Sequence, residues 1–177
     1  MNDLKSDLKA LDGSVIVVRS IRYKGSYIDA HHEKYVKVTG CPRSQLLDKD
    51  WSKFLVHYVR DNIICLESLR YRDQYLDMHH EQREGHHMIK ITPCNFIPND
   101  LPWALFSVWG EDLSNVGIRS ERWTNRWLDA HHPEFPLGRF LMGTKHDPKT
   151  RPSKPWGQFE LMFSQPIVDQ YKTVASE

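Results

Sequence analysis

Cysteine is scarce in this chain of 177 residues, which has three thiols at Cys41, Cys65 and Cys94. An odd number of cysteines with no Cys-x-x-Cys spacing argues against a disulfide framework and against a zinc site built from thiolates. The sequence therefore predicts reduced thiols and a cytoplasmic protein.

Long apolar segments and an excess of one charge are also absent. The first residues, Met1 to Asp12, lack the apolar core of a signal peptide, and no later stretch is long enough to be a membrane helix. The 24 basic and 23 acidic residues are mixed along the chain and give a formal net charge of +1. This balance indicates no basic surface for nucleic acid, heparin or an anionic membrane. We expect a soluble protein with no nucleic-acid partner and no membrane span.

An internal repeat is the main positive signal. The pattern Ser-x-Arg-(Tyr/Trp)-x-x-x-(Tyr/Trp)-(Ile/Leu)-Asp-(Ala/Met)-His-His occurs three times, beginning at Ser20, Ser68 and Ser120. A second pattern, Trp-x-x-Phe, follows each copy and begins at Trp51, Trp103 and Trp156. Together they define a unit of about fifty residues, and we expect the Trp and Phe side chains to pack within or between the units.

Each unit is expected to contain four short strands. Val15 to Val18, Phe54 to Val59 and Ile63 to Leu66 are rich in β-branched and aromatic residues, and helical periodicity is absent. In the aromatic-(Ile/Leu)-Asp-(Ala/Met) segment, the strand alternation predicts that Ile28 and Ala30 face the core. The three units together then supply twelve strands.

These counts favour a closed fold. Three units are too few for a propeller, and a linear stack would leave exposed sheet edges, whereas closure around a threefold axis removes them. We therefore predict an all-β fold, a β-trefoil of twelve strands in three pseudo-symmetric repeats, with an irregular β-sandwich as the alternative. The single domain spans residues 1–177, with repeats at about 14–62, 63–115 and 116–166 and peripheral tails at 1–13 and 167–177.

The residues also resemble known families. Asn62 to Ser68, followed by Tyr75-Leu76, is similar to the repeat of fascin-like and hisactophilin-like β-trefoils. The Tyr-Leu strand with a loop and a Trp-containing strand after it resembles amaranthin-type agglutinins, and the resemblance spans roughly Ser14 to Phe163. It implies a non-enzymatic binder of actin filaments or of carbohydrate. The Gln-x-Trp motif of ricin-type lectins is absent, and the histidines are concentrated in the repeated pairs.

The Asp-x-His-His element is the candidate binding site. Residues two apart in a strand share a face, so the aspartate and the first histidine of each copy lie side by side. A carboxylate and an imidazole can bind paired sugar hydroxyls, while the preceding aromatic ring stacks on the sugar. Three such sites would gain affinity by multivalency. The candidate ligand-binding residues are Tyr27, Asp29, His31, His32, Tyr75, Asp77, His79, His80, Trp127, Asp129, His131 and His132.

A structural role for the same motif is equally supported. Each copy also contains an arginine, and a symmetric hairpin would place Ile21 opposite Asp29, with Arg22 near the carboxylate. Repeated Arg-Asp pairs, with Ser-His hydrogen bonds, would then lock each unit to the next.

Metal binding and catalysis find less support. Asp-x-His offers two ligands per strand, too few for a closed site without His86, His87 or His146. No Ser-His-Asp order or glycine-rich phosphate loop is present. We expect a non-enzymatic protein without metal or cofactor, whose partner is a carbohydrate or glycoconjugate, or alternatively actin or another protein.

Overall fold

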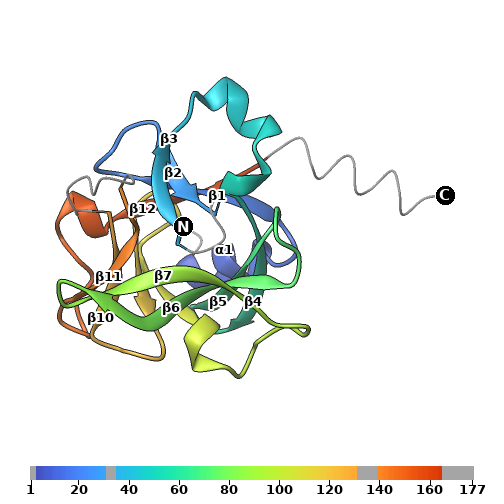
Figure 1. Ribbon diagram of the computed structural model, residues 1–177. Helices are drawn as coiled ribbons and strands as arrows, with labels where there is room; N and C mark the ends of the chain where they lie inside the picture. The colour runs from blue at the N-terminus through green and yellow to red at the C-terminus, as the bar shows by residue number, and fades with distance from the viewer. Residues whose placement is uncertain (1–2, 31–34, 131–138, 165–177) are drawn as a thin grey trace.

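The computed structural model describes residues 3–30, 35–130 and 139–164, and its chain is almost entirely β (Figure 1). Helix α1 spans Leu4–Ala10. Six strands form a barrel: β1 (Val15–Ser20), β4 (Lys53–Arg60), β5 (Ile63–Ser68), β8 (Phe106–Gly110), β9 (Val116–Ser120) and β12 (Phe159–Phe163). Six form hairpins: β2 (Ser26–Asp29), β3 (Lys37–Gly40), β6 (Gln74–Arg83), β7 (His86–Pro93), β10 (Arg126–Asp129) and β11 (Met142–Lys145). Short 3-10 turns precede β4, β8 and β12: η1 (Arg43–Asp48), η2 (Asp50–Ser52), η3 (Pro102–Ala104) and η4 (Pro155–Gly157).

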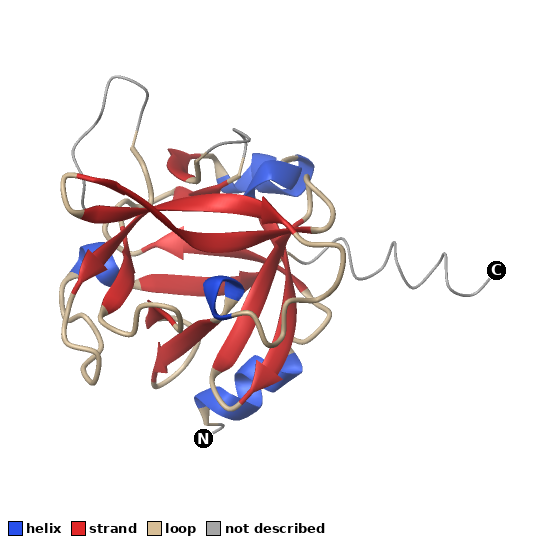
Figure 2. Ribbon diagram, turned by 60° about the horizontal axis from the view of Figure 1, so that its bottom comes forward, coloured by secondary structure: helices blue, strands red, loops and turns tan. Residues whose placement is uncertain are grey.

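The barrel closes on itself. Strand β1 pairs with β12 and β4, β5 pairs with β4 and β8, and β9 pairs with β8 and β12, all antiparallel. Each barrel strand is therefore hydrogen-bonded to a neighbour on both sides, and none is an unpaired edge strand. Figure 2 shows the strands around the interior and the helical segments at the periphery. The three predicted groups of four strands are confirmed.

The three hairpins close one end of the barrel. Each touches a barrel strand through one bridge, at Arg19–Tyr27, Glu67–Tyr75 and Arg119–Trp127. The hairpins also bond to one another, since the N–H of Val36 donates to the Ile89 carbonyl at 2.9 Å and that of Leu141 to the Val36 carbonyl at 3.0 Å. These bonds place segments from all three repeats side by side.

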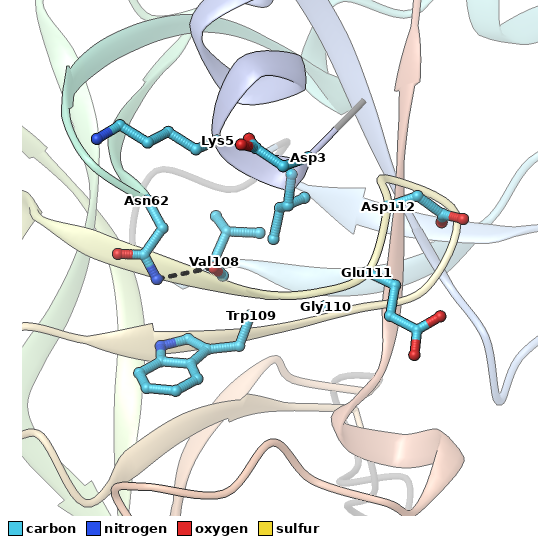
Figure 3. Close-up of a pocket in the computed structure, with 9 residues that line it drawn as sticks. Asp3, Lys5, Asn62, Val108, Trp109, Gly110, Glu111 and Asp112 are labelled. Atoms are coloured by element: carbon cyan, nitrogen blue, oxygen red, sulfur yellow. Dashed lines mark hydrogen bonds between the residues drawn. The ribbon is translucent and has the colours of Figure 1, made fainter. Parts of the chain in front are cut away.

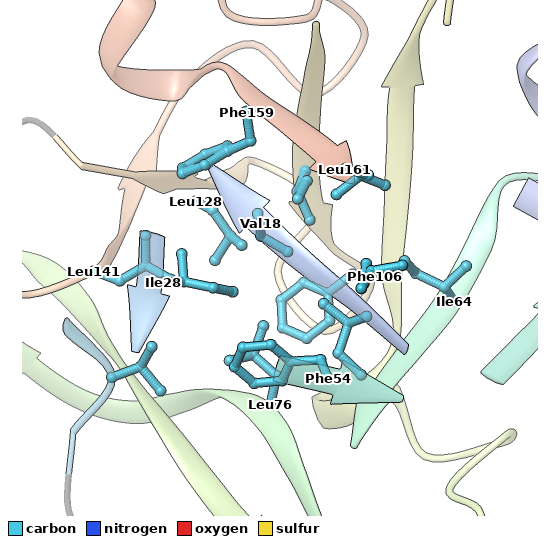
Figure 4. Packing of buried hydrophobic residues seen from close by; sticks show 14 of the residues in the cluster. Val18, Ile28, Phe54, Ile64, Leu76, Phe106, Leu128, Leu141, Phe159 and Leu161 are labelled. Atoms are coloured by element: carbon cyan, nitrogen blue, oxygen red, sulfur yellow. The ribbon is translucent and has the colours of Figure 1, made fainter. Parts of the chain in front are cut away.

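The core lies inside the barrel and under the hairpins (Figure 4). Phe54, Phe106 and Phe159, the phenylalanines of the Trp-x-x-Phe pattern, are fully buried. They occupy equivalent positions, because each is opposite the serine that begins a copy of the repeated motif. The predicted inward face of the motif is also confirmed: the positions of Ile28 and Ala30 are fully buried in every copy.

The N-terminal segment differs from expectation. We expected a peripheral tail at 1–13, but Leu8 and Leu11 are fully buried in the main core and Leu4 packs against it. Asp3 caps α1, its carboxylate accepting a hydrogen bond from Ser6 N at 2.8 Å. The other predicted tail, 167–177, lies outside the described residues. None of the described helices has the length and apolar character needed to cross a membrane.

Truncation of the equivalent phenylalanines tests the threefold core. Phe54→Ala, Phe106→Ala and Phe159→Ala are each expected to lower the free energy of unfolding by about 3–5 kcal/mol, because each leaves a cavity in a closed interior. Urea denaturation followed by circular dichroism measures the change. Phe96→Ala is the matched control, since Phe96 is 56% exposed and its truncation is expected to have little effect. A loss of less than about 1 kcal/mol at any of the three core sites would contradict the proposed equivalence.

Candidate functional site

The aspartates of the repeated motif are buried. Asp29, Asp77 and Asp129 are 4%, 3% and 2% exposed. The Oδ2 atom of Asp29 accepts a hydrogen bond from the Thr39 hydroxyl, and that of Asp77 from the Thr92 hydroxyl, each at 2.7 Å. Because each bond joins the two strands of one hairpin, these carboxylates hold the hairpin rather than face solvent.

The aromatic rings expected to stack on sugars are buried too. All three rings lie on the outside of the barrel, but the loops and 3-10 turns that precede β4, β8 and β12 cover them: Tyr27, Tyr75 and Trp127 are each less than 4% exposed. Trp127 donates its indole N–H to the Asp147 carbonyl at 3.1 Å and meets Trp109 edge to face at 5.9 Å. The described rings thus present no exposed face of the kind that the carbohydrate hypothesis requires.

The histidine pairs can be followed in the second repeat alone. His80 is exposed, His79 is half-buried, and their rings lie 4.0 Å apart. The Nδ1 atom of His79 accepts a hydrogen bond from Glu81 N at 3.2 Å, and burial lowers the pKa of His79. The remaining candidates, His31, His32, His131 and His132, lie outside the described residues.

The serine of each motif fixes a turn. The hydroxyls of Ser20, Ser68 and Ser120 accept hydrogen bonds from the backbone N–H three residues later, in each case at 3.2 Å. Such a bond holds the chain where it leaves a barrel strand and enters a hairpin. All three serines are buried, which accounts for the small polar residue at this position.

The arginine of each motif does not pair with the aspartate of its own copy. Arg19 is opposite Tyr27, so the predicted register with Ile21 opposite Asp29 is wrong. The strands meet at one bridge and then diverge, which leaves the arginine side chain at the surface. Arg22, Arg70 and Arg122 instead lie over the ring of the next residue, at 5.4, 5.6 and 4.4 Å from its centre.

Two of these aromatic residues, Trp123 and Tyr23, join neighbouring repeats. The imidazole of His87, on the second hairpin, stacks on Trp123 of the third repeat with ring centres 3.9 Å apart. Arg139, which lies between β10 and β11 in the third hairpin, is over the ring of Tyr23 of the first repeat, 3.5 Å from its centre. Besides the backbone hydrogen bonds between hairpins, stacked rings and cations therefore join the units. The expected Arg-Asp pairs within each copy are not found among the described residues.

Asp77 does interact electrostatically with a motif arginine, but that arginine, Arg122, belongs to the next repeat. Burial raises the pKa of Asp77, whereas the Thr92 hydrogen bond and the charge of Arg122 from the third repeat act to lower it. Its Oδ1 atom has no hydrogen-bond partner among the described residues. Asp77, Arg122, Trp123 and His87 thus form one cluster at the boundary between the second and third repeats.

A groove lies at the opposite end of the barrel (Figure 3). We call it the α1 groove; its volume is about 610 Å³, and it is lined by Asp3, Leu4, Lys5, Asn62, Val108, Trp109, Gly110, Glu111 and Asp112. Its elements are α1, the β4–β5 turn and the β8–β9 turn. The groove combines one indole, one amide, one ammonium and three carboxylates around an apolar floor.

Hydrogen bonds hold the polar walls of the α1 groove in place. The Asn62 amide donates to the Val108 carbonyl at 2.9 Å, and the half-buried Trp109 donates its indole N–H to the Ser107 hydroxyl at 3.0 Å. The Asp112 carboxylate accepts hydrogen bonds from the hydroxyl and the backbone N–H of Ser114, which lower the pKa of Asp112. The guanidinium of Arg119 lies 5.0 Å from the Trp109 ring centre.

The repeated pattern gave no indication of the α1 groove. Its lining comes from three segments far apart in sequence, and α1 has no counterpart in the other repeats. The available signal was Trp109, a tryptophan outside both repeated patterns. In the described parts of the chain, no three His, Cys, Asp or Glu side chains are grouped so as to hold a metal ion.

Solved structures with the same architecture include a designed threefold-symmetric protein, ThreeFoil, with a TM-score of 0.63 and 11% identity over 85% of this chain and 99% of that one. The chain is a β-trefoil. The fold also matches 17% of a mosquitocidal holotoxin chain, with a TM-score of 0.66, 8% identity and 85% of this chain covered. A GlcNAcα1-4Gal-releasing endo-β-galactosidase from Clostridium perfringens matches with a TM-score of 0.61 and 14% identity, over 85% of this chain and 32% of the enzyme. The β-trefoil therefore spans less than a third of the holotoxin and about a third of the enzyme.

No protein-family model matches the β-trefoil chain, and no curated protein matches it. The similarity to the solved structures lies below 25% identity and concerns the fold.

The joint between the second and third repeats is expected to weaken in acid. Burial lowers the pKa of His87 below the 6.5 of an unfolded histidine, so the unfolded state binds the proton more strongly. The stability that neutral His87 confers is complete above about pH 6.5 and is lost as the pH falls through its pKa in the folded protein. His87→Phe keeps a ring on Trp123 without titrating. Between about pH 7.5 and about pH 5, urea denaturation should show a larger loss of unfolding free energy in the wild type than in the variant.

Asp77 and His79 are present in both proteins. Since His87→Phe also removes the 2.8 Å hydrogen bond between His87 Nδ1 and the His79 carbonyl, the comparison uses the pH dependence of stability and not its absolute value. Parallel curves over this range would show that the His87–Trp123 stack is not sensitive to protonation.

Proposed function

We propose that this β-trefoil is a non-enzymatic carbohydrate-binding protein and that it holds a neutral glycan in the α1 groove. The observation that carries the proposal is Trp109, a half-buried tryptophan that lines a groove of about 610 Å³ together with Asn62 and three acidic residues. An indole face suits the apolar C–H side of a sugar ring. The surrounding carboxylates and amide suit its hydroxyls, because charged acceptors make the stronger hydrogen bonds.

The polar groups of the α1 groove are held before any ligand arrives. Asn62 is fixed to the backbone of β8, Asp3 caps α1, and Asp112 is bonded to Ser114. A pre-organised wall loses less conformational freedom on binding, and more of the contact energy then appears as affinity.

The α1 groove supports one site per chain, in place of the three sites expected from the repeated motif. Trp109 is opposite Gly117 in the barrel, and the equivalent positions in the other repeats carry Met162, opposite Val17, and His57, opposite Cys65. Helix α1 is likewise the single α-helix in residues 3–30, 35–130 and 139–164. In this proposal the threefold motif stabilises the fold, and the ligand binds at Trp109 and α1, where the three repeats differ.

The hydrogen bonds of two of the three groove carboxylates, Asp3 and Asp112, favour binding over glycoside hydrolysis. A hydrolase needs one carboxylic acid whose pKa is raised so that it can donate a proton. In the α1 groove, hydrogen bonds lower the pKa of Asp112, and the Asp3 carboxylate caps α1. The endo-β-galactosidase resembles this chain over 32% of its own length, which supports the proposal at the level of fold and does not carry over its activity.

A protein-binding role is the second candidate, favoured by the loop between β7 and η3. Phe96 and Ile97 are adjacent there and are 56% and 47% exposed. An exposed apolar pair on a loop is a feature of protein-interaction surfaces. Co-sedimentation with actin filaments, repeated with Phe96→Ala and Ile97→Ala, tests this role; actin retained by the wild type and lost by both variants would support it.

Glycan binding at Trp109 is tested in two steps. A glycan array with the wild-type protein identifies a ligand, and isothermal titration calorimetry then compares Trp109→Ala with the wild type. We expect a loss of at least tenfold in affinity, because the stacked sugar loses its platform. Trp109→Phe should retain part of the affinity, which separates loss of stacking from loss of folding.

Phe96→Ala is the matched control, since it removes an exposed aromatic ring outside the groove. An array without neutral glycans, or equal affinity of Trp109→Ala and wild type, would overturn the proposal.

A further inference from the structure

The three turns that carry the motif arginines lie at one end of the barrel. Around the barrel, strands β1, β5 and β9 alternate with β4, β8 and β12, and each neighbouring pair is antiparallel. Strands β1, β5 and β9 therefore run in the same direction. The turns that follow them, residues 21–25, 69–73 and 121–125, emerge together at the end closed by the hairpins.

Each of these turns presents one exposed guanidinium. Arg22, Arg70 and Arg122 are exposed, and each lies over the half-buried ring of the next residue. None of the three is within 4 Å of a carboxylate in the described parts of the chain. Stacking engages the flat face of a guanidinium and leaves its N–H edge free to bind an anion.

Charge is divided between the two ends of the barrel. The three arginine turns contain five cations, Arg22, Lys24, Arg70, Arg72 and Arg122, and two carboxylates, Asp73 and Glu121. Glu121 is already paired with Arg119 at 3.0 Å. At the other end, residues 3–14, 61–62 and 111–115 contain six carboxylates and two cations, Lys5 and Lys9, and Lys5 is paired with Asp61 at 2.9 Å. The net charge of +1 therefore conceals a basic end and an acidic end.

We propose that the three arginine turns form a trivalent surface for an anionic polysaccharide, with one sulfate or carboxylate group bound at each guanidinium. A single exposed arginine beside an aromatic ring is common on protein surfaces. Three of them at equivalent positions, each lying over its own ring and none within 4 Å of a carboxylate among the described residues, form a repeated binding surface for repeated anionic groups. The expectation of no polyanion-binding surface rested on the net charge and on the mixing of basic and acidic residues along the sequence, and neither reports where the charges lie on the folded surface.

A flexible anionic polysaccharide fits this surface better than nucleic acid. The sites are on three separate turns around the barrel, so the ligand has to bend to reach more than one of them. The rings that could stack on bases carry their own arginines, and Trp123 is also covered by His87. Guanidinium groups bind both sulfate and carboxylate bidentately, and three weak contacts along one chain gain affinity by multivalency.

Heparin is the probe for the experiment, with uncharged dextran as its counterpart. The wild-type protein should bind heparin at low salt, and its affinity should fall as salt is added. Replacement of one arginine, as in Arg70→Gln, should weaken binding by about tenfold, and Arg22→Gln, Arg70→Gln and Arg122→Gln together should weaken it by at least a hundredfold. Arg-to-Lys substitution at all three positions keeps the charge but loses the planar fork, so its affinity should lie between these values.

The matched control removes the same charge elsewhere. Lys9→Gln, Arg60→Gln and Lys149→Gln replace three exposed cations outside the arginine turns and should leave heparin affinity within about threefold of wild type. Circular dichroism establishes that every variant is folded. Trp109→Ala should bind heparin like the wild type, so failure of the α1 groove and failure of the arginine turns are distinguished.

Three results would overturn the proposal: no heparin binding by the wild type, an equal loss in the two triple variants, or equal or tighter binding to duplex DNA or to phosphatidylserine vesicles. The last result would assign the arginine turns to another class of partner. A hundredfold loss confined to the arginine triple variant, with dextran, DNA and vesicles unbound, would support an anionic polysaccharide.

Discussion

Closure of six antiparallel strands into a barrel is the constraint on which the rest of the structure depends. A unit of four strands has one apolar face and cannot bury it alone. Three units bury theirs together, with Phe54, Phe106 and Phe159 at equivalent places in one core. The barrel also needs a cover at its end, and the three hairpins supply it by bonding to each other through Val36, Ile89 and Leu141.

The repeated motif follows from this need to join three units. Its serine fixes the turn out of the barrel, and its aspartate accepts a hydrogen bond from a threonine across the hairpin in the first two repeats. In the first and third repeats its first aromatic residue contacts a neighbouring unit. The stacked joints are not chemically equal. Arg139 over Tyr23 carries a permanent charge, whereas His87 on Trp123 is held neutral by burial, so the two boundaries respond differently to acid.

One of the two proposed functional surfaces departs from the threefold symmetry, and the other repeats with it. The α1 groove exists because one helix packs against one end of the barrel, and its lining includes α1, which no other barrel turn among the described residues carries. The arginine turns exist because the same turn is used three times, and they present the same group three times. One end of the molecule thus offers a single acidic groove and the other a set of repeated cations, which accounts for a nearly neutral protein with two differently charged ends.

The sequence by itself determined the threefold repeat, the strand content, the inward face at Ile28 and Ala30, and the buried phenylalanines. These follow from spacing and alternation, which act locally and are copied three times. Only the tertiary structure decided where the polar residues went. From the sequence, Asp29 and Tyr27 were predicted to be an exposed pair because strand alternation places them on one face. Strand alternation cannot show that loops from elsewhere in the chain cover that face. Likewise α1, Asn62 and Trp109 form a groove because the closed barrel brings together residues that are far apart in sequence. No local sequence pattern predicts such a contact.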